Sequence, residues 1–313
     1  MKRVSEMIGM RAKLGVCAVS GGSGFLGRRF LKYLEKSCQK IIILGRRPVD
    51  GYEFIKWDIS DDLKPNLVGH NIDTVFHLAG YAHDTSSSTS TDIYDRCNFL
   101  ATKNLFEAAV KSEIKYFLFV SSAKAGGEAF DVPVNEENLS SPIGVYGQSK
   151  LAAEDYLRAE FSQKISTIIL RPTLMYGPGL KGNLFKMRNA ISRGWFPRPP
   201  KNLKGLKSMV HVDDCARALI HLRTNVRPGV ETYYLTDGEK YSPYDIDSAL
   251  DMQLSRFRPT LPLWLLRMAS KLPFLKPLYA KLYGFNLYSS NKLTDTGFVC
   301  RGTIFDIDRE LFE

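Results

Sequence analysis

The sequence predicts an α/β fold: a doubly wound parallel Rossmann sheet with a smaller, interleaved C-terminal substrate-binding lobe. Three observations support this. Apolar segments of strand length alternate with helical patterns through the first half, a glycine-rich turn follows the first such segment, and the pattern loosens after Arg171-Pro172. Such alternation is typical of parallel strands joined by right-handed crossovers. The carboxyl ends of the strands, and with them a ligand site, are expected along one edge.

The expected strands of the sheet lie at 13–19, 41–44, 53–57, 73–79, 115–121 and 166–171. Helical patterns occupy 25–37, 92–112 and 144–163. A later strand at 231–236 is expected to return to the main sheet, so the two lobes interleave. We therefore predict a sheet domain at 12–178 with return segments near 209–236, and a second lobe at 179–313.

Composition narrows the classes of partner. The 313 residues include 43 basic and 33 acidic side chains, giving a net charge of +10. A basic excess suits nucleic acid, anionic membranes or phosphorylated small molecules. No run of five or more Lys/Arg and no nucleic-acid-binding module occurs, so nucleic acid is not an expected partner. No apolar stretch is long enough to predict a transmembrane segment.

The five cysteines indicate the compartment. They are widely spaced and form no CxxC pair, which is typical of reduced thiols in a cytoplasmic protein. We accordingly expect a cytoplasmic location and no metal site.

The glycine-rich turn predicts a dinucleotide site. Gly21 permits a tight turn, Gly24 lets a pyrophosphate approach the backbone, and Gly27 lets the following helix pack closely on the sheet. Phe25 and Leu26 open that helix, whose first amides and dipole favour phosphate. The alternative is a purely structural turn, which the flanking strand and amphipathic helix make less favourable.

The ends of the next two strands bear on the choice of cofactor. Arg46 and Arg47 stand where an acidic residue would bind the ribose of NAD, so they favour NADP(H) over NAD(H). The alternative is that both arginines are simply solvated. Asp58 and Ile59 end the following strand and are candidates for contact with the adenine amino group, or for an ordinary turn.

Tyr146 and Lys150 form the predicted catalytic pair. Four residues apart on a helix, they share one face. A phenol of pKa about 10 is a poor base at neutral pH, but a neighbouring ammonium would favour the phenolate. Ser122, at the end of the fifth strand, is placed to hydrogen-bond the substrate oxygen. A lone YxxxK pattern is more often a surface pair; the glycine turn and the serine favour catalysis.

These motifs together resemble the extended branch of the short-chain dehydrogenase/reductase superfamily. Further segments fit the same pattern, namely His77-Leu78-Ala79-Gly80, 98–105, 171–179 and 211–214. The resemblance implies that Leu78, Ala79 and Gly80 line the cofactor and that Asn98 supports the active site. It also implies that Ser122, and not Ser121, is the catalytic serine.

Two departures from the family pattern matter. Gly126 replaces the usual aromatic residue, which predicts a different substrate fit. Ala123 and Lys124 stand where sugar dehydratases carry an Asp-Glu pair, which disfavours dehydration.

The resemblance also implies a nucleotide-sugar substrate. Residues 179–183 and 194–199 are similar to segments that hold a nucleoside diphosphate. Asn183 is a candidate donor to that diphosphate, and Lys207 stands where many such enzymes have arginine. Lysine neutralises charge but cannot form a bidentate pair.

The implied function is hydride transfer at C4 of a nucleotide-linked hexose, with a slight preference for reduction of a 4-keto sugar. The alternatives are a UDP-hexose 4-epimerase that retains NAD, a reductase of a hydrophobic ketone, and a non-catalytic nicotinamide-binding regulator.

Two surface predictions remain. The basic, apolar segment 259–284 is either two short helices, broken by Pro273 and Pro277, that roof a pocket, or a peripheral membrane contact. Helices 92–112 and 144–163 are candidates for the four-helix seam of a homodimer.

Overall fold

The computed structural model describes residues 14–82, 91–128, 130–138, 140–160, 165–180, 182–225, 228–251 and 257–305. Residue 13 of the first predicted strand and residues 161–163 of the last predicted helix lie outside these ranges.

The core of the molecule is a seven-stranded parallel sheet with the strand order β3-β2-β1-β4-β5-β6-β9. The fold class predicted from the sequence is confirmed. The strands are β1 (Leu14–Ser20), β2 (Cys38–Gly45), β3 (Glu53–Lys56), β4 (Ile72–His77), β5 (Tyr116–Val120), β6 (Ser166–Pro172) and β9 (Val230–Leu235). The order reverses between β1 and β4, which is where open sheets of this type bind ligands.

The central strands are apolar because both of their faces are covered. Ala18 in β1 pairs with Ile42 of β2 on one side and with Val75 of β4 on the other, and all three side chains are fully buried. The returning strand β9 pairs along β6 from Val230 to Leu235, so chain from the second half completes the sheet.

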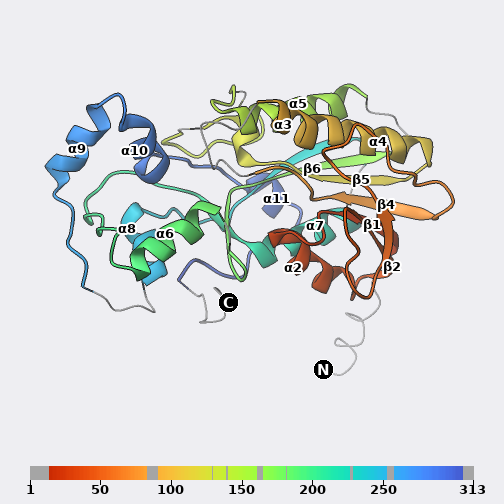
Figure 1. Cartoon of the computed structure of the whole chain (residues 1–313), viewed down its shortest axis with the longest axis horizontal. Helices are drawn as coiled ribbons and strands as arrows, with labels where there is room; N and C mark the ends of the chain where they lie inside the picture. Colours follow the sequence, from red (N-terminus) through yellow and green to blue (C-terminus); the bar gives the residue numbers. More distant parts are fainter. Residues whose placement is uncertain are drawn as a thin grey trace.

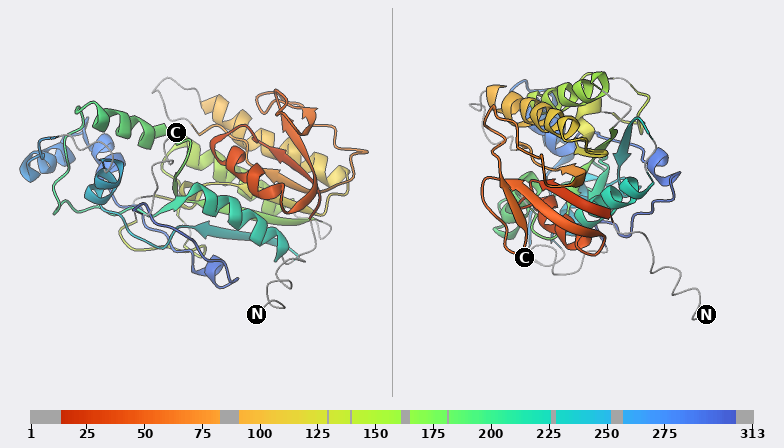
Figure 2. Two further views of the ribbon diagram at one scale, coloured as in Figure 1. Left: turned by 90° about the horizontal axis from the view of Figure 1, so that it is seen from below. Right: turned by 90° about the vertical axis from the view of Figure 1, so that its right-hand side faces the viewer.

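Helices cover the two faces of the sheet (Figures 1 and 2). One face carries α3 (Thr91–Tyr94), a π-helical turn (Asp95–Leu100), α4 (Ala101–Lys111) and α5 (Val145–Ala159). The other carries α2 (Phe25–Leu34), α7 (Val212–Thr224) and α11 (Asn291–Thr294). The helices α2 and α7 pack side by side.

The remaining elements form a lobe beyond the carboxyl edge of the sheet (Figure 1). It contains the small parallel pair β7 (Leu174–Tyr176) and β8 (Met209–His211), and the helices α6 (Gly182–Ser192), α8 (Pro243–Asp251), α9 (Leu263–Lys271) and α10 (Lys276–Tyr283). The lobe has its own small core, which includes Tyr176, Leu184, Met209 and Ile246.

Two predicted helices differ in detail from the structure. The helix predicted at 25–37 ends at Leu34, because β2 already begins at Cys38. The helix predicted at 92–112 is three segments, since the wider turn Asp95–Leu100 interrupts it. Wider turns of this kind occur frequently at functional sites.

Within the described residues, no helix is long and apolar enough to cross a membrane. The same part of the chain holds no group of three or more His, Cys, Asp or Glu side chains that could bind a metal ion.

Candidate active site

The glycine-rich turn connects β1 to α2 at the carboxyl edge of the sheet. Gly21 has φ of +76°, and a Cβ there would lie 2.7 Å from the amide nitrogen of Ala79. A Cβ on Gly27 would lie 2.1 Å from the carbonyl oxygen of Gly21. Both positions therefore require glycine, and the turn is pressed against the segment that follows β4.

The start of α2 fits a phosphate group. Its N-cap residue, Gly24, has no side chain to cap the helix, and the first turn holds no acidic residue. A Cβ on Gly24 would meet only the oxygen of Gly21, at 3.1 Å. The backbone N–H groups of Phe25 and Leu26, in the first turn of α2, can therefore donate hydrogen bonds to an anion. The positive end of the helix dipole adds to the attraction.

A directed chain of hydrogen bonds runs beneath the turn. The Thr102 hydroxyl donates to the carbonyl oxygen of Asn98 at 2.6 Å, so its oxygen must accept from His77 Nε2, 3.0 Å away. His77 Nδ1 then accepts from the Ser20 hydroxyl at 2.6 Å, and Ser20 Oγ accepts from the amide of Ala79. Burial and the nearby Lys150 ammonium lower the pKa of His77 to about 3, so the ring is neutral.

Asn98 ties this chain to the helix that bears the predicted catalytic residues. Its side chain accepts from the amide of Tyr81 at 2.8 Å and donates to the Tyr81 carbonyl and to Ser149 Oγ, both at 3.0 Å. The Ser149 hydroxyl in turn donates to the carbonyl of Tyr146. Asn98 thus joins the segment after β4 to the first turn of α5.

The buried face of α5 carries polar groups as well as apolar ones. Lys150, Ala153, Glu154 and Leu157 recur at helical spacing and all face inward. Lys150 Nζ donates to the carbonyl oxygen of Val120 at 3.1 Å. The orientation of α5 therefore directs the Lys150 side chain toward the edge of the sheet, between the ends of β4 and β5.

The surroundings of Lys150 are close-packed. Its Nζ lies 4.6 Å from the centre of the Phe119 ring, a cation–π contact. A Cβ on Gly80 would come within 3.0 Å of Nζ, so that glycine makes room for the ammonium. Burial lowers the pKa of Lys150 to about 8, while the Glu154 carboxylate raises it. The amine is therefore mostly protonated at neutral pH.

Tyr146 and Ser122 meet at the same edge. Ser122 caps the short 3₁₀ turn η2 (Ala123–Gly126) by accepting from the amide of Lys124, and it hydrogen-bonds the Tyr146 phenol. The Tyr146 ring lies edge-on to Tyr94 at 6.3 Å between ring centres.

The pKa of Tyr146 departs from the sequence expectation. Burial raises it to about 12; the Ser122 hydrogen bond opposes this rise and Tyr94 adds to it. We expected the neighbouring lysine to favour the phenolate, but Lys150 is not among the groups that shift the pKa of Tyr146, and burial dominates. Tyr146 is a neutral phenol here, able to donate a proton.

Sequence reasoning missed one charged cluster beneath the site. Arg171 Nε and a terminal nitrogen bind the Glu154 carboxylate at 3.0 and 2.6 Å, and the Ser121 hydroxyl donates to it at 2.5 Å. Glu154 is fully buried. Its position four residues after Lys150 was the available signal, since both side chains share one helix face.

The same cluster explains Gly126. Arg171 also donates to the Tyr234 hydroxyl at 3.1 Å, and a Cβ on Gly126 would lie 1.7 Å from that hydroxyl oxygen. Tyr234, from β9, therefore occupies the space against the backbone of Gly126. The usual aromatic residue is missing at position 126, and the ring of Tyr234 from β9 lies there instead.

The predicted adenosine contacts lie at the ends of β2 and β3. Arg46 is 78% exposed, and its Nε lies 4.0 Å from Asp58 Oδ2; Arg47 is also exposed. Asp58 accepts from the amide and hydroxyl of Ser60, as in an ordinary turn, and Ile59 is half-buried beside it.

The two predicted substrate residues lie in the lobe. Lys207 is nearly buried; burial and Lys124 lower its pKa to about 8, while Glu128 raises it. Lys124 lies two residues after Ser122 in η2 and forms an ion pair with Glu128 at 3.1 Å. Both charges act on the pKa of Lys207, so Lys207 lies within electrostatic range of the serine turn. Asn183 is exposed in the first turn of α6.

Asp213 and Asp214 follow the start of α7, but neither of them caps this helix. The cap is His211, whose Nδ1 accepts from the Asp213 amide at 3.2 Å. Asp213 instead binds Arg29 of α2 through two hydrogen bonds, and Asp214 accepts from the amide of Arg301.

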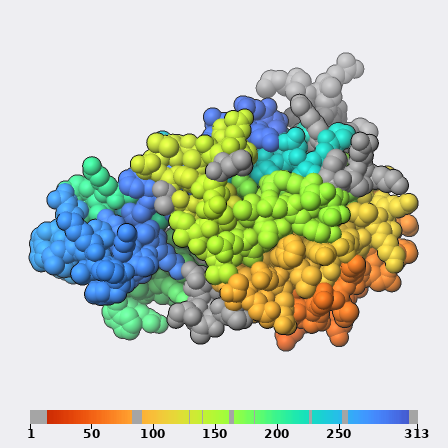
Figure 3. Space-filling view, turned by 90° about the horizontal axis from the view of Figure 1, so that it is seen from above, coloured from red at the N-terminus to blue at the C-terminus, as the bar shows by residue number. Residues whose placement is uncertain are grey.

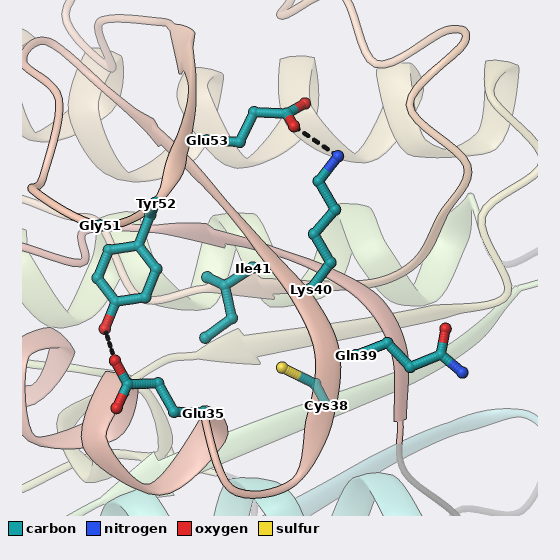
Figure 4. A pocket seen from close by; sticks show the side chains of 8 residues that line it. All are labelled: Glu35, Cys38, Gln39, Lys40, Ile41, Gly51, Tyr52 and Glu53. Atoms are coloured by element: carbon teal, nitrogen blue, oxygen red, sulfur yellow. Dashed lines mark hydrogen bonds and ion pairs between the residues drawn. The ribbon is translucent and has the colours of Figure 1, made fainter.

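A hollow of about 500 Å³ lies at the opposite edge of the sheet, where β2 and β3 begin (Figure 4). Its charged groups are already paired, Lys40 with Glu53 and the Tyr52 hydroxyl with Glu35. Because it is separated from the carboxyl edge by the length of the strands, it takes no part in the site described above.

Most of the chain matches a known protein family. Residues 17–235 match the model of the NAD dependent epimerase/dehydratase family. The chain belongs to this family. It is an enzyme of the extended short-chain dehydrogenase/reductase type, as the motifs predicted.

Two relatives are named as 4-epimerases of sugars. A UDP-glucose 4-epimerase of Vibrio cholerae is 27% identical over 266 residues, which cover 81% of each chain. An Escherichia coli O157:H7 enzyme, N-acetyl-alpha-D-glucosaminyl-diphospho-ditrans,octacis-undecaprenol 4-epimerase, is 27% identical over 78% of this chain and 73% of its own. Among solved structures, MoeE5 in complex with UDP-glucuronic acid and NAD is 25% identical, with a TM-score of 0.73 over 93% of this chain and 95% of its own.

We predict that Glu154→Gln destabilises the fold by about 3–5 kcal/mol, because the Arg171 guanidinium then stays buried without its counter-charge. Asp155→Asn is the matched control: Asp155 is the adjacent residue, 63% exposed, and its ion pair with Arg158 is worth less than about 1 kcal/mol. Urea unfolding measures both. Equal losses in the two variants would contradict the role assigned to Glu154.

Proposed function

We propose that the protein transfers a hydride to or from C4 of a hexose linked to a diphosphate, with Tyr146 as the proton donor or acceptor at the 4-oxygen. The observation that carries this proposal is the convergence of the Tyr146 phenol, the Ser122 hydroxyl and the Lys150 ammonium at the sheet edge where the strand order reverses. The family and its sugar-modifying relatives support it.

In the reducing direction each group has one task. The Ser122 hydroxyl donates a hydrogen bond to the 4-keto oxygen, and the Tyr146 phenol transfers its proton to that oxygen as C4 gains the hydride. Lys150 stabilises the resulting phenolate through its charge. A bound nicotinamide supplies the hydride and its electron pair. The pKa of about 12 for Tyr146 keeps the proton in place until charge develops on the oxygen.

The residues of the cradle fit the cofactor's phosphates. The uncapped amides at Phe25 and Leu26 would hold the pyrophosphate, and Gly80 leaves room for Lys150 to reach the nicotinamide ribose. Leu78 and Ala79, held against the glycine turn, would line the ring side of the groove.

We assign the cofactor as NADP(H). Arg46 and Arg47 project from the end of β2 into solvent, and planar guanidiniums match a 2′-phosphate. Asp58, 4.0 Å from Arg46, orients that guanidinium. An exchangeable NADP(H) favours reduction of a 4-keto sugar over epimerisation.

The sugar carrier is assigned as a diphosphate ester. Lys207, beside Lys124 and the serine turn, would neutralise a phosphate charge, and its lowered pKa indicates that an anion there would be stabilising. Asn183 would donate to the same group from α6. Relatives carry the sugar on a nucleotide or on undecaprenol, and both carriers share this diphosphate.

A 4-epimerase that retains NAD is the second candidate, favoured by the first-named relative. Tyr146, which is half-buried, and Lys150, which is buried, are both present, and this argues against a non-catalytic regulator. A hydrophobic ketone substrate would leave Lys207 without an anion to pair with.

We also propose that the protein forms a homodimer whose helical interface is made by α4 and α5 of each copy.

We predict that Tyr146→Phe lowers kcat by about 100-fold or more, because the proton donor is removed while the ring remains. The dissociation constant for the cofactor should change little, since the cradle lies on other elements. Steady-state kinetics and cofactor titration measure the two effects. A variant with wild-type turnover would show that another group moves the proton.

We predict that Arg46→Ala raises KM for NADPH about tenfold while leaving KM for NADH nearly unchanged, because only NADPH carries the 2′-phosphate. Parallel kinetics with the two cofactors make the comparison. Equal effects on both would remove the argument for NADP(H).

We predict that the protein purifies without cofactor and binds added NADPH. Denaturation followed by mass spectrometry identifies any nucleotide released. Stoichiometric NAD in that release would instead assign the protein as an epimerase, because an epimerase must return the hydride that it has taken.

A further inference from the structure

The hairpin of α9 and α10, residues 263–283, exposes apolar side chains instead of burying them. Trp264, Met268 and Leu272 follow one another at i, i+4 and i+8, and are 63%, 53% and 37% exposed. Phe274, between the helices, is 75% exposed, and Leu278 of α10 is 53% exposed. In α9 only Leu266 is buried, so the helix turns most of its apolar side chains outward.

The charge of this surface has one sign. Arg267 and Lys271, one turn apart, flank the apolar stripe on α9, and Lys276 begins α10; all three are exposed. The sequence holds no Asp or Glu between Asp251 and Asp295. An exposed apolar stripe beside a purely basic one is the pattern of helices that lie in the interface of an anionic bilayer.

The position of the hairpin suits a flat partner. It protrudes at one end of the molecule, away from the sheet (Figures 1 and 3). It is fastened to the body on its inner side, where Leu266 and Tyr283 pack against Leu203. The outer side can therefore meet a surface without loss of the contacts that hold the hairpin.

The hairpin also reaches the candidate site. Lys207 Nζ donates to the carbonyl oxygen of Lys281 in α10 at 3.1 Å, and the carbonyl of Tyr283 lies against Gly205 so closely that a Cβ there would come within 2.0 Å. The residue proposed to meet the substrate's diphosphate is thus bonded directly to the α9–α10 hairpin.

We propose that the α9–α10 hairpin docks the protein on an anionic membrane surface, with Trp264, Met268 and Phe274 in the acyl–headgroup boundary and Arg267, Lys271 and Lys276 against lipid phosphates. The two helices predicted for 259–284 are present. Pro273 lies between them, as predicted, but Pro277 stands in the first turn of α10 and does not break a helix. This binding needs no turnover, so its test is separate from that of the proposed function.

The test is co-sedimentation of the full chain with vesicles of phosphatidylcholine alone or mixed with phosphatidylglycerol. We expect binding to the mixed vesicles, weakening as salt is raised, and little binding to phosphatidylcholine. Near an anionic surface each basic side chain contributes about fivefold to binding. Failure of the wild type to sediment with the mixed vesicles would overturn the proposal.

Two variants test the two components. The apolar variant is Trp264→Ser/Phe274→Ser, and the charge variant is Arg267→Glu/Lys271→Glu/Lys276→Glu. Each should lower the vesicle-bound fraction at least about tenfold. The substituted side chains are exposed, so the fold should persist, as far-UV circular dichroism will verify.

Matched controls carry the same substitutions elsewhere on exposed positions. They are Leu63→Ser/Val299→Ser for the apolar component and Lys32→Glu/Lys36→Glu/Lys111→Glu for the charge. Both controls should bind vesicles as the wild type does. If a control loses as much binding as its matched hairpin variant, the binding depends on net charge or overall surface hydrophobicity and not on the hairpin. Sedimentation velocity gives a further check: a wild-type dimer that the apolar variant alone dissociates would assign the surface to a second copy of this chain and overturn the proposal.

Discussion

The orientation of α5 against the sheet is the constraint on which the rest of the site depends. An amphipathic helix normally buries only apolar groups, yet this one turns Lys150 and Glu154 inward along with Ala153 and Leu157. Both charges are tolerated because each has partners: the Val120 carbonyl and Phe119 ring for the lysine, and Arg171 for the glutamate. Rotation of α5 would break these contacts and strand both charges in the core.

Burial gives the site its acid–base character. The same desolvation moves the pKa of Tyr146 up and that of Lys150 down, so the phenol stays neutral while the amine keeps a pKa of about 8. Each shift alone would oppose catalysis by a phenolate. In the proposed reaction, negative charge that develops on the substrate oxygen would draw the proton from the phenol, and the Lys150 ammonium would stabilise the phenolate that remains.

The sequence predicted the sheet and the glycine-rich turn at its edge better than the supporting contacts. Glycine spacing and apolar strands have local signatures, so the turn at Gly21–Gly27 and the strand returning near 231–236 could be located. The Arg171–Glu154 pair and the Ser20–His77–Thr102 chain join residues far apart in sequence, and no single segment encodes them. The sign of the Tyr146 pKa shift depended on burial, which spacing alone does not report.

Because of the π-helical turn at Asp95–Leu100, the fold does not tolerate the deletion of a residue at this point. Such a turn holds one residue more than a regular α-helical turn. Deleting any one of its residues would let the helix close up regularly, and each residue of an α-helix turns by about 100°. Either Asn98 would then rotate out of hydrogen-bonding distance of Tyr81 and Ser149, or α4 would rotate and lose its packing against the sheet. Length variation among homologues should therefore fall outside this turn, even where the residues themselves change.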